Sequence, residues 1–191
     1  MIETTSIVIM ASGFSKRMGK SKLFLPIHKK TFLEHTIDRA LAAGFYEVIV
    51  VIQPEDAKRC QFPAGVKVTL NYHSKEGQSS SVRLGTATAM GKAILFCPID
   101  QPLLTIEGLQ KIADHGSVHH IVVPFYQKIA KGPVCFGSDY FSELTRLTGD
   151  EGGRSVRDRH KDKWICLEFA DNQLLDIDSP EAYDQFIAKS Y

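Results

Sequence analysis

The sequence predicts a Rossmann-like α/β fold of three layers, α/β/α, in which helices cover both faces of a mostly parallel sheet. Continuous apolar runs typical of buried strands, such as residues 48–52, alternate with segments of helical period. Such alternation favours parallel strands joined by right-handed crossovers. A chain of 191 residues with 43% hydrophobic residues can build one sizeable core, and no internal repeat or low-complexity linker divides it. We therefore expect a single domain over residues 1–191.

Charge and hydropathy exclude several classes of function. The formal net charge is +1, which gives no general attraction to nucleic acid or to an anionic membrane. No apolar run approaches the length that spans a bilayer. The N-terminus lacks the basic start and the cleavage site of a signal peptide. The sequence predicts a cytoplasmic protein without nucleic-acid or membrane partners, and its four scattered cysteines are expected to be buried apolar side chains.

The first predicted strand leads into a glycine-rich turn. Small residues and glycines allow the backbone to turn sharply and to approach a ligand closely. Three cations follow, Lys16, Arg17 and Lys22. Backbone N–H groups and cations in such a turn suit phosphate, whereas a tight turn with solvated lysines is the alternative.

The spacing of the glycines separates this turn from two familiar phosphate loops. Five residues stand between Gly13 and the Gly19-Lys20-Ser21 segment, whereas a P-loop has four. A P-loop nucleotide site therefore ranks second. The glycine pattern of a dinucleotide-binding fold is not present.

A helix and two strands are predicted next. Thr31 and Glu34 have the spacing of a capping box, which opens a helix that a glycine ends. Residues 48–52 and 66–71 are expected to be strands, with a short helix after Pro54. Ligands in open parallel sheets bind beyond the carboxyl ends of the strands. The residues that follow each strand are therefore the candidates for a site.

A polar run follows the third strand. That strand ends at Asn71, and the residues Gly77-Gln78-Ser79-Ser80-Ser81 begin the next helix. Three serines after a glycine supply cap hydroxyls and unpaired N–H groups. A plain helix cap is the alternative. Because such a run lowers helix propensity, the sequence favours a binding role for these residues at least as much as a cap.

One carboxylate stands at the end of the next predicted strand. Asp100 follows the apolar run 93–98 and lies between Pro98 and Pro102, which restrict the backbone. A rigidly held carboxylate at the carboxyl edge of a sheet suits Mg²⁺, which binds through carboxylates, phosphates and water. An Asp that caps the following turn is the less favoured alternative.

The remaining elements are predicted from caps and apolar runs. Thr105 is expected to cap a helix to about residue 115, and Ser138 a helix through Leu147. The other expected segments are strands at 119–124, 132–136 and 164–169, and a loop or small β-element at 125–131.

Two later segments place charge beside a helix start. Two glycines precede Arg154, which gives either an anion-binding helix start or a solvated loop. Ser179 as N-cap and Pro180 at the first helical position begin the terminal helix. These roles leave Asp178 without a structural explanation.

The glycine-rich turn resembles the opening signature of the MobA-like nucleotidyltransferases. The matching residues are Met10-Ala11-Ser12-Gly13-x-Ser15-x-Arg17-Met18-Gly19-x-x-Lys22. In that family the loop holds the triphosphate of a nucleotide, and Arg17 and Lys22 match its two signature cations. Ser12 departs from the pattern, in which users of CTP carry Ala and users of GTP carry Gly, and its size favours CTP.

Four further segments resemble the family in the same order along the chain. They imply that Asp100 binds the metal ion, that Asp178 is a second and weaker ligand, and that Arg154 lies on the acceptor side. The segment Gly132-Pro133 resembles a family strand but lacks its usual Asn or His. The nucleotide-binding residues that the resemblance implies are Ala11, Ser12, Gly13, Ser15, Lys16, Asn71, Gly77, Gln78, Ser79 and Ser80.

The resemblance implies a fold like that of the nucleotide-diphospho-sugar transferases and a nucleotidyl transfer that requires Mg²⁺. We expect CMP from CTP to pass to a molybdopterin-type acceptor, with pyrophosphate released and a molybdenum hydroxylase as a possible downstream partner. The alternatives are GTP with the same acceptor, a sugar phosphate or methylerythritol phosphate acceptor, a P-loop kinase, and a cofactor chaperone that binds nucleotide without catalysis.

Overall fold

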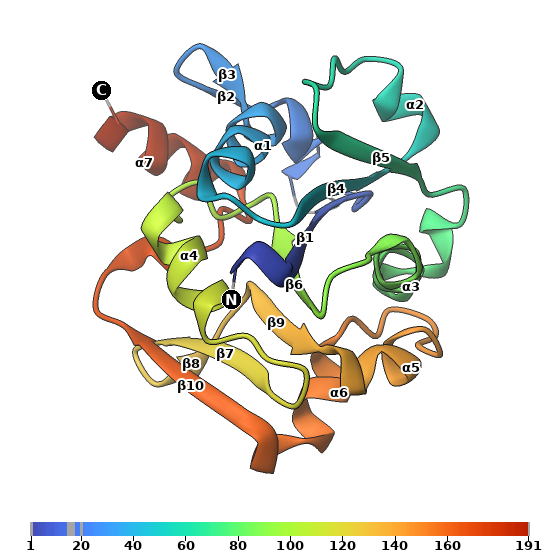
Figure 1. Ribbon diagram of the computed structural model, residues 1–191. Coiled ribbons are helices and arrows are strands. Elements are labelled where there is room, and N and C mark those ends of the chain that lie inside the picture. Colours follow the sequence, from blue (N-terminus) through green and yellow to red (C-terminus); the bar gives the residue numbers. More distant parts are fainter. Residues whose placement is uncertain (1, 15–17, 20, 191) are drawn as a thin grey trace.

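The computed structural model describes residues 2–14, 18, 19 and 21–190 (Figure 1). In this part of the chain one eight-stranded sheet contains β1 (Thr5–Ala11), β4 (Glu47–Ile52), β5 (Val66–Leu70), β6 (Ala93–Pro98), β7 (Ile121–Tyr126), β8 (Ile129–Ala130), β9 (Val134–Gly137) and β10 (Trp164–Phe169). A small second sheet pairs β2 (Pro26–Ile27) with β3 (Lys30–Thr31). The α-helices are α1 (Phe32–Ala43), α2 (Pro54–Ala57), α3 (Gln78–Thr88), α4 (Ile106–Asp114), α5 (Phe141–Leu144), α6 (Arg154–Arg159) and α7 (Pro180–Ser190).

The order of the strands places a crevice next to β1. Across the sheet the order is β10-β7-β9-β6-β1-β4-β5, with β8 paired to β7. The ladders are parallel except where β9 pairs with β6 and β7 and where β8 pairs with β7. The chain moves outward from β1 through β4 to β5 and then returns to the other side of β1 as β6. Ligands bind outside the carboxyl ends of the strands at such a reversal.

Alternating side chains of β1 bury both faces of the sheet. Ile7 and Ile9 pack with Ile37 of α1 and Ile112 of α4, and Val8 packs on the opposite face with Val82 of α3. All six side chains are buried. Figure 1 shows α1 and α4 on one side of the central strands and α3 and α5 on the other. The predicted three-layer arrangement is confirmed.

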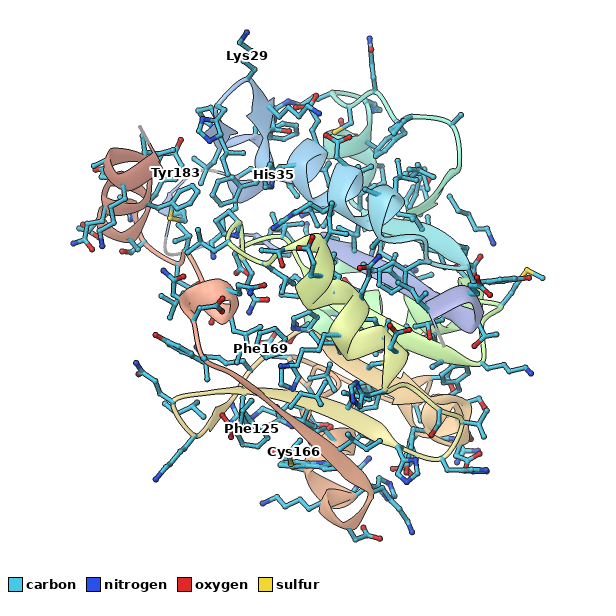
Figure 2. All side chains as sticks on the ribbon, turned by 60° about the vertical axis from the view of Figure 1, so that its left-hand side comes forward. Lys29, His35, Phe125, Cys166, Phe169 and Tyr183 are labelled. Atoms are coloured by element: carbon cyan, nitrogen blue, oxygen red, sulfur yellow. The ribbon has the colours of Figure 1, made fainter. Side chains whose placement is uncertain are left out.

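A third apolar cluster joins the terminal helix to α1. The ring of Phe32 makes edge contacts with Tyr183 at 5.9 Å and with Phe186 at 6.1 Å between centroids. Tyr183 projects from α7 toward α1, where His35 lies (Figure 2). Burial lowers the pKa of His35 to about 4. This packing places the segment that precedes α7 beside the carboxyl edge of the sheet.

Most predicted elements are confirmed. Thr31 and Glu34 form the capping box of α1, and Gly44 ends that helix with a positive φ of 83°. The hydroxyl of Thr105 accepts a hydrogen bond from the backbone N–H of Gly108 and caps α4. The segment expected at 125–131 as a loop or small β-element forms a hairpin through β8, which pairs with the end of β7.

Two predictions are wrong. Ser138 does not cap a helix through Leu147, because residues 138–140 form one 3₁₀ turn and α5 spans only Phe141–Leu144. The backbone N–H of Ser138 instead donates to the carbonyl of Lys92 at 3.1 Å, so this turn is held by a neighbouring segment. Cys166 is exposed on β10 (Figure 2) and Cys60 is only partly buried, whereas Cys97 and Cys135 are buried as expected. Among the described residues, no helix has both the length and the apolar character needed to cross a membrane.

Candidate active site

The end of β1 is fixed by hydrogen bonds from three directions. Beyond Ala11, the carbonyl of Ser12 accepts from Gln53 Nε2 at 3.2 Å, and its hydroxyl lies 2.5 Å from the Ser81 hydroxyl. Asn71 Nδ2 also donates to the Ser12 hydroxyl at 3.2 Å. Gln53 follows β4, Asn71 follows β5, and Ser81 lies on α3. The first turn of the loop is therefore attached to three different elements. The loop therefore leaves the sheet in a defined direction.

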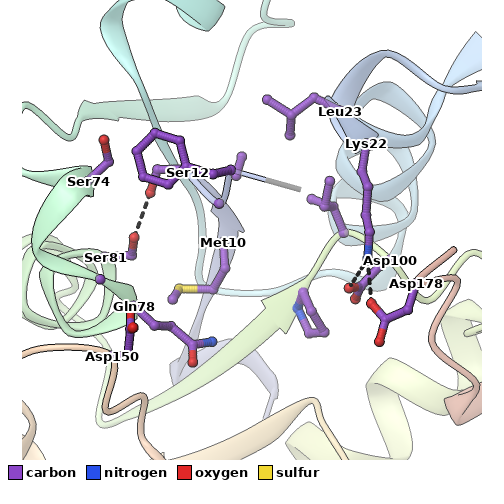
Figure 3. A pocket seen from close by; sticks show the side chains of 16 residues that line it. Met10, Ser12, Lys22, Leu23, Ser74, Gln78, Ser81, Asp100, Asp150 and Asp178 are labelled. Atoms are coloured by element: carbon purple, nitrogen blue, oxygen red, sulfur yellow. Dashed lines mark hydrogen bonds and ion pairs between the residues drawn. The ribbon is translucent and has the colours of Figure 1, made fainter. Parts of the chain in front are cut away.

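This loop lines a cavity of about 470 Å³ at the carboxyl edge of the sheet. Figure 3 shows the Ser12–Ser81 contact on one side of the cavity and Lys22 with two carboxylates on the other. The lining residues are Met10, Ala11, Ser12, Gly13, Phe14, Lys22, Leu23, Ser74, Gly77, Gln78, Ser81, Pro98, Ile99, Asp100, Asp150 and Asp178. A cavity of this size is within the range of small-molecule sites.

Lys22 lies between two carboxylates that come from distant parts of the chain. Its ammonium is 3.0 Å from Asp100 Oδ2 and 2.5 Å from Asp178 Oδ1 (Figure 3). The Lys22 side chain is only 9% exposed. Burial on its own would lower the pKa of Lys22, but the charges and hydrogen bonds of Asp100 and Asp178 raise it above its ordinary value. Lys22 is therefore a fixed cation that two anions share.

Backbone contacts bring these two carboxylates together. Asp100 follows β6, and its carbonyl accepts a hydrogen bond from the N–H of Ile177 at 2.8 Å. Asp178 is the next residue and precedes α7. The Arg39 guanidinium of α1 donates to the carbonyls of Pro102 at 3.0 Å and of Leu104, which holds the loop after Asp100 against the helix. The site thus depends on elements from both halves of the chain.

The donor set at this point fits a hard divalent cation that is shared with a ligand. Asp100 and Asp178 direct carboxylate oxygens at one cationic atom, and such oxygens are what Mg²⁺ prefers. Within residues 2–14, 18, 19 and 21–190, no group of three or more His, Cys, Asp or Glu side chains could hold a metal ion. Two carboxylates with phosphate oxygens and water are the usual set for Mg²⁺ in phosphate chemistry. The residues therefore fit a magnesium ion whose remaining ligands are water or the phosphate oxygens of a substrate.

Glycines allow a second wall of the cavity to approach α3. Gly77, the N-cap of α3, has a φ of 96°, and a Cβ there would lie 2.4 Å from Asp150 Oδ1. A Cβ at Gly152 would lie 2.4 Å from Gln78 Oε1. Gly77 requires glycine because of its positive φ and its close approach to the backbone of Gly149, whereas a side chain at Gly152 would meet the flexible end of Gln78. The result is that residues 149–153 pack directly on the start of α3.

A second cavity of about 290 Å³ adjoins the first. The two share the residues Met10, Gln78, Pro98 and Asp100. The other lining residues are Val82, Phe96, Gln101, Gly132, Val134, Phe136, Gly152, Gly153, Arg154, Arg157 and Asp176. Its lining combines apolar side chains with two arginines, of which Arg154 is 82% exposed and Arg157 is buried. Asp100 thus lies where two compartments meet.

The structure brings most of the predicted site residues together. The predicted residues that line one of the two cavities are Ala11, Ser12, Gly13, Lys22, Gly77, Gln78, Asp100, Arg154 and Asp178. Asn71, Ser79 and Ser80 are buried behind the cavity wall, where Asn71 Nδ2 donates to the Ser80 hydroxyl at 2.9 Å. Ser15, Lys16 and Arg17 lie outside the described residues.

The sequence interpretation did not identify Ser81, Asp150, Arg157 and Asp176 as lining residues. The helical period of α3 could have identified Ser81 as a lining residue. Residues 78, 81 and 82 lie three or four positions apart and share one face of α3, which is the face that lines the cavities. The predicted pair Ser79 and Ser80 points elsewhere.

Comparison with known proteins assigns this architecture to a family. Residues 7–164 match the MobA-like NTP transferase domain. The purine catabolism protein PucB of Bacillus subtilis is 29% identical over 191 residues, which cover 93% of this chain and 93% of PucB. A probable molybdenum cofactor guanylyltransferase of Rhodopirellula baltica is 38% identical over 109 residues, which cover 53% of this chain and 51% of that protein.

Solved structures share the whole fold. The crystal structure of Rv0371c from Mycobacterium tuberculosis superposes with a TM-score of 0.82 at 26% identity, covering 96% of this chain and 97% of that chain. A second structure of that protein, described as a complex with manganese, has a TM-score of 0.79 at 24% identity and covers 97% of this chain and 98% of that chain.

Proposed function

The chain belongs to the family of MobA-like NTP transferase domains, and from this premise we propose that it transfers CMP from CTP to the terminal phosphate of a molybdopterin-type acceptor. Pyrophosphate leaves, and the product is a dinucleotide form of the cofactor. One observation carries the proposal. The Lys22 ammonium lies between Asp100 and Asp178 at the wall of a cavity that the glycine-rich loop also lines. A cation and a pair of metal-binding carboxylates beside a phosphate-type loop are the parts that phosphoryl and nucleotidyl transfer require.

The choice of CTP depends on Ser12. Its side chain is buried, and its hydroxyl is engaged by Ser81 and Asn71 rather than directed into the cavity. A serine in this position occupies nearly the volume of alanine, which CTP-dependent members carry, and more than the glycine of GTP-dependent members. GTP is the alternative, because relatives such as that of Rhodopirellula baltica bear the name guanylyltransferase.

The second cavity is the proposed compartment for the acceptor. Its lining includes the apolar side chains of Phe96 and Phe136 together with Arg154. A planar ring system with a phosphate matches this combination, because the ring can pack on the apolar side chains while the phosphate meets a guanidinium. A molybdenum hydroxylase would be the natural recipient of the product.

In the proposed mechanism an oxygen of the acceptor phosphate attacks the α-phosphorus, and the bond between the α-phosphorus and the bridging oxygen to the β-phosphorus breaks. The electron pair of that bond leaves with pyrophosphate. The loop N–H groups, Lys22 and Arg17 stabilise the charge that develops on the leaving group. No protein nucleophile or strong base is required, since the acceptor phosphate is already an anion. The chain's contribution is positioning and electrostatic stabilisation.

Asp100 is the proposed principal ligand for Mg²⁺, and Asp178 the weaker one. The bound ion would screen the repulsion between the acceptor phosphate and the triphosphate. The same two carboxylates hold Lys22 in the structure, so Lys22 would exchange these partners for phosphate oxygens if Asp100 and Asp178 bound the metal ion. Lys22 in this way offsets part of the negative charge of the two carboxylates before the substrates arrive.

A pyrophosphate-release assay tests the proposal. Each of the four ribonucleoside triphosphates is supplied with Mg²⁺ and molybdopterin, and parallel reactions contain a sugar phosphate or methylerythritol phosphate as acceptor. We expect pyrophosphate with CTP and molybdopterin. Release with GTP instead would keep the reaction and change the base, whereas release with another acceptor would change the substrate class.

The same assay separates the remaining alternatives. A P-loop kinase would produce a nucleoside diphosphate and no pyrophosphate. A chaperone without catalysis would bind the nucleotide and release no product. Either result would overturn the proposed reaction.

A further inference from the structure

Gln101 follows the proposed metal ligand directly, and its side chain is almost completely buried at 2% exposure. Its amide nitrogen has three acceptors, the carbonyl of Gly132 at 3.0 Å, the carbonyl of Leu174 at 3.3 Å and Asp176 Oδ1 at 2.9 Å. One amide thus connects the turn before β9 and the segment before α7 to the end of β6. The proposed reaction mechanism assigns no role to Gln101 or to these hydrogen bonds.

The connection matters because Asp178 has little regular structure of its own. It lies in the irregular segment between Leu174 and α7, and 78 residues separate it from Asp100. Two ties hold that segment at Asp100, the hydrogen bond from the N–H of Ile177 and the amide of Gln101. The first fixes the backbone one residue before Asp178, and the second fixes the side chain two residues before it.

The other oxygen of Asp176 is also engaged. Lys131 Nζ donates to Asp176 Oδ2 at 3.2 Å, and the Asp176 side chain is 33% exposed. Each of its oxygens therefore has a partner other than Lys22, one being Gln101 and the other Lys131 in the turn before β9. Asp176 serves as an attachment point, while Asp178 is left to face the cation.

The amide oxygen of Gln101 has no hydrogen-bond partner among the described residues, although it is buried. A buried polar atom without a partner costs free energy, so an amide would not be kept here for packing alone. An apolar side chain of the same length would fill the volume without that cost. The hydrogen bonds that the amide nitrogen donates are therefore the reason for a glutamine at this position.

We propose that Gln101 is a positioning residue that sets the distance between Asp100 and Asp178, and with it the affinity for the metal ion. It does this through the hydrogen bond to Asp176 and the two carbonyls. This inference rests on the proposed metal site, and the experiment below distinguishes the failure of one from the failure of the other. Residues that orient metal ligands without touching the metal commonly change affinity about 10- to 100-fold when replaced.

The test measures the affinity for Mn²⁺ alone by the loss of the electron paramagnetic resonance signal of the free ion. Asp100→Asn reports on the metal site itself, and Gln101→Met removes the donor while keeping the length of the side chain. Gln110→Met is the matched control, because Gln110 also donates an amide hydrogen bond to a carbonyl, that of Ala43 at 3.1 Å, but far from the site. We expect Gln101→Met to bind Mn²⁺ at least about tenfold more weakly than the wild type and Gln110→Met to match the wild type.

A second pair of variants keeps the test valid if Gln101→Met does not fold. Asp176→Asn and Asp176→Ala both remove a negative charge near Asp100, but only asparagine retains an oxygen that can accept from Gln101. We expect Asp176→Asn to bind Mn²⁺ severalfold more tightly than Asp176→Ala. Equal affinities for this pair would overturn the inference.

The remaining outcomes are also decisive. If Asp100→Asn loses Mn²⁺ binding and Gln101→Met retains it, the inference fails and the metal site stands. If Asp100→Asn binds as well as the wild type, the metal site itself is wrong, and the inference fails with it.

Discussion

Lysine–carboxylate contacts lie at both ends of the central strands, and their surroundings differ. At the amino ends, Lys67 Nζ donates to Glu47 Oε2 at 2.6 Å, while Glu47 Oε1 accepts from the Ser6 hydroxyl and from the N–H of Met90, each at 2.6 Å. Each carboxylate oxygen is thus matched by donors. The turn after α3 covers this end of the sheet, and the hydrogen bonds of Glu47 hold this turn and the neighbouring strands together.

At the carboxyl ends of the strands, the number of carboxylates for each ammonium group is different. One ammonium, that of Lys22, is shared by Asp100 and Asp178 beside a cavity of about 470 Å³. The local charge of these three groups is negative by one. Burial raises the pKa of Asp100, the Lys22 ammonium opposes that rise, and Asp176 and Asp178 add to it.

The difference shows which of two chemically similar contacts serves stability. The Glu47 contact is complete without any ligand, whereas the Lys22 contact lies in the wall of a cavity and includes the two carboxylates that we propose as metal ligands. Mutations at the two ends are therefore expected to separate activity from stability.

The largest effect is expected from Asp100→Asn. Loss of the principal metal ligand should lower turnover about 10³-fold, equivalent to about 4 kcal/mol of transition-state stabilisation. The free energy of unfolding should not fall, because the change removes one of two carboxylates that share one cation. Steady-state pyrophosphate release and urea unfolding measure the two quantities. Turnover at the wild-type rate would remove Asp100 from the site.

Lys22→Met should lower turnover about 10²-fold, because a cation that stabilises the leaving group is lost. The same variant should bind Mn²⁺ alone more tightly than the wild type, since a competing ammonium no longer occupies the position between the carboxylates. Mn²⁺ titration followed by electron paramagnetic resonance tests this increase. Lys16→Met is the control from the same loop and should lose far less activity. Equal losses for the two lysines would contradict the proposed alignment of the loop.

Much of this site could be predicted from sequence because its key residues follow strands. Parallel strands bring their carboxyl ends to one edge, so the loop after β1 and Asp100 were expected on the same side of the sheet, and Lys22 of that loop lies 3.0 Å from Asp100. Asp178 could be placed there only through resemblance, because its segment has no regular structure. The role of Gln101 was not predictable, since its three acceptors come from segments 31 to 75 residues away and leave no local pattern.

The strand order shows the same limit. The alternation of elements predicts parallel pairing, but β9 runs antiparallel between β6 and β7. A short strand of four residues carries no periodicity that distinguishes the two directions. Similarly, the 3₁₀ turn at Ser138 is determined by a contact with Lys92 that local sequence does not encode.

At the opposite end of the sheet, Glu47→Gln should reduce stability and spare activity. The variant weakens hydrogen bonds to a charged group that is 12% exposed, which should cost about 1–2 kcal/mol of unfolding free energy. Turnover should stay at the wild-type level because the amino ends of the strands are remote from the cavity. Lys67→Met, whose side chain is 43% exposed, should cost less than about 1 kcal/mol. Loss of turnover in folded Glu47→Gln would contradict the separation of the two ends.

The smallest expected effect is the dependence of stability on pH at Glu47. Burial alone would raise its pKa, but hydrogen bonds from Lys67, Ser6 and Met90 bring it below the ordinary value of 4.5. The unfolded chain therefore takes up a proton at higher pH than the folded chain. This contribution to stability is present above pH 4.5 and is lost as the pH falls through the lower, folded pKa. Thermal unfolding from pH 6 to pH 3 should show a smaller loss in Glu47→Gln, and parallel curves would exclude Glu47 as a source.

The most direct measurement of the central claim is the identity of the phosphate product in single-turnover reactions, followed by ³¹P magnetic resonance. With CTP, Mg²⁺ and molybdopterin, the wild type and Glu47→Gln should form one pyrophosphate per dinucleotide product, and Asp100→Asn should form almost none. Orthophosphate or a nucleoside diphosphate in place of pyrophosphate, or an unchanged yield with Asp100→Asn, would contradict nucleotidyl transfer at this edge of the sheet.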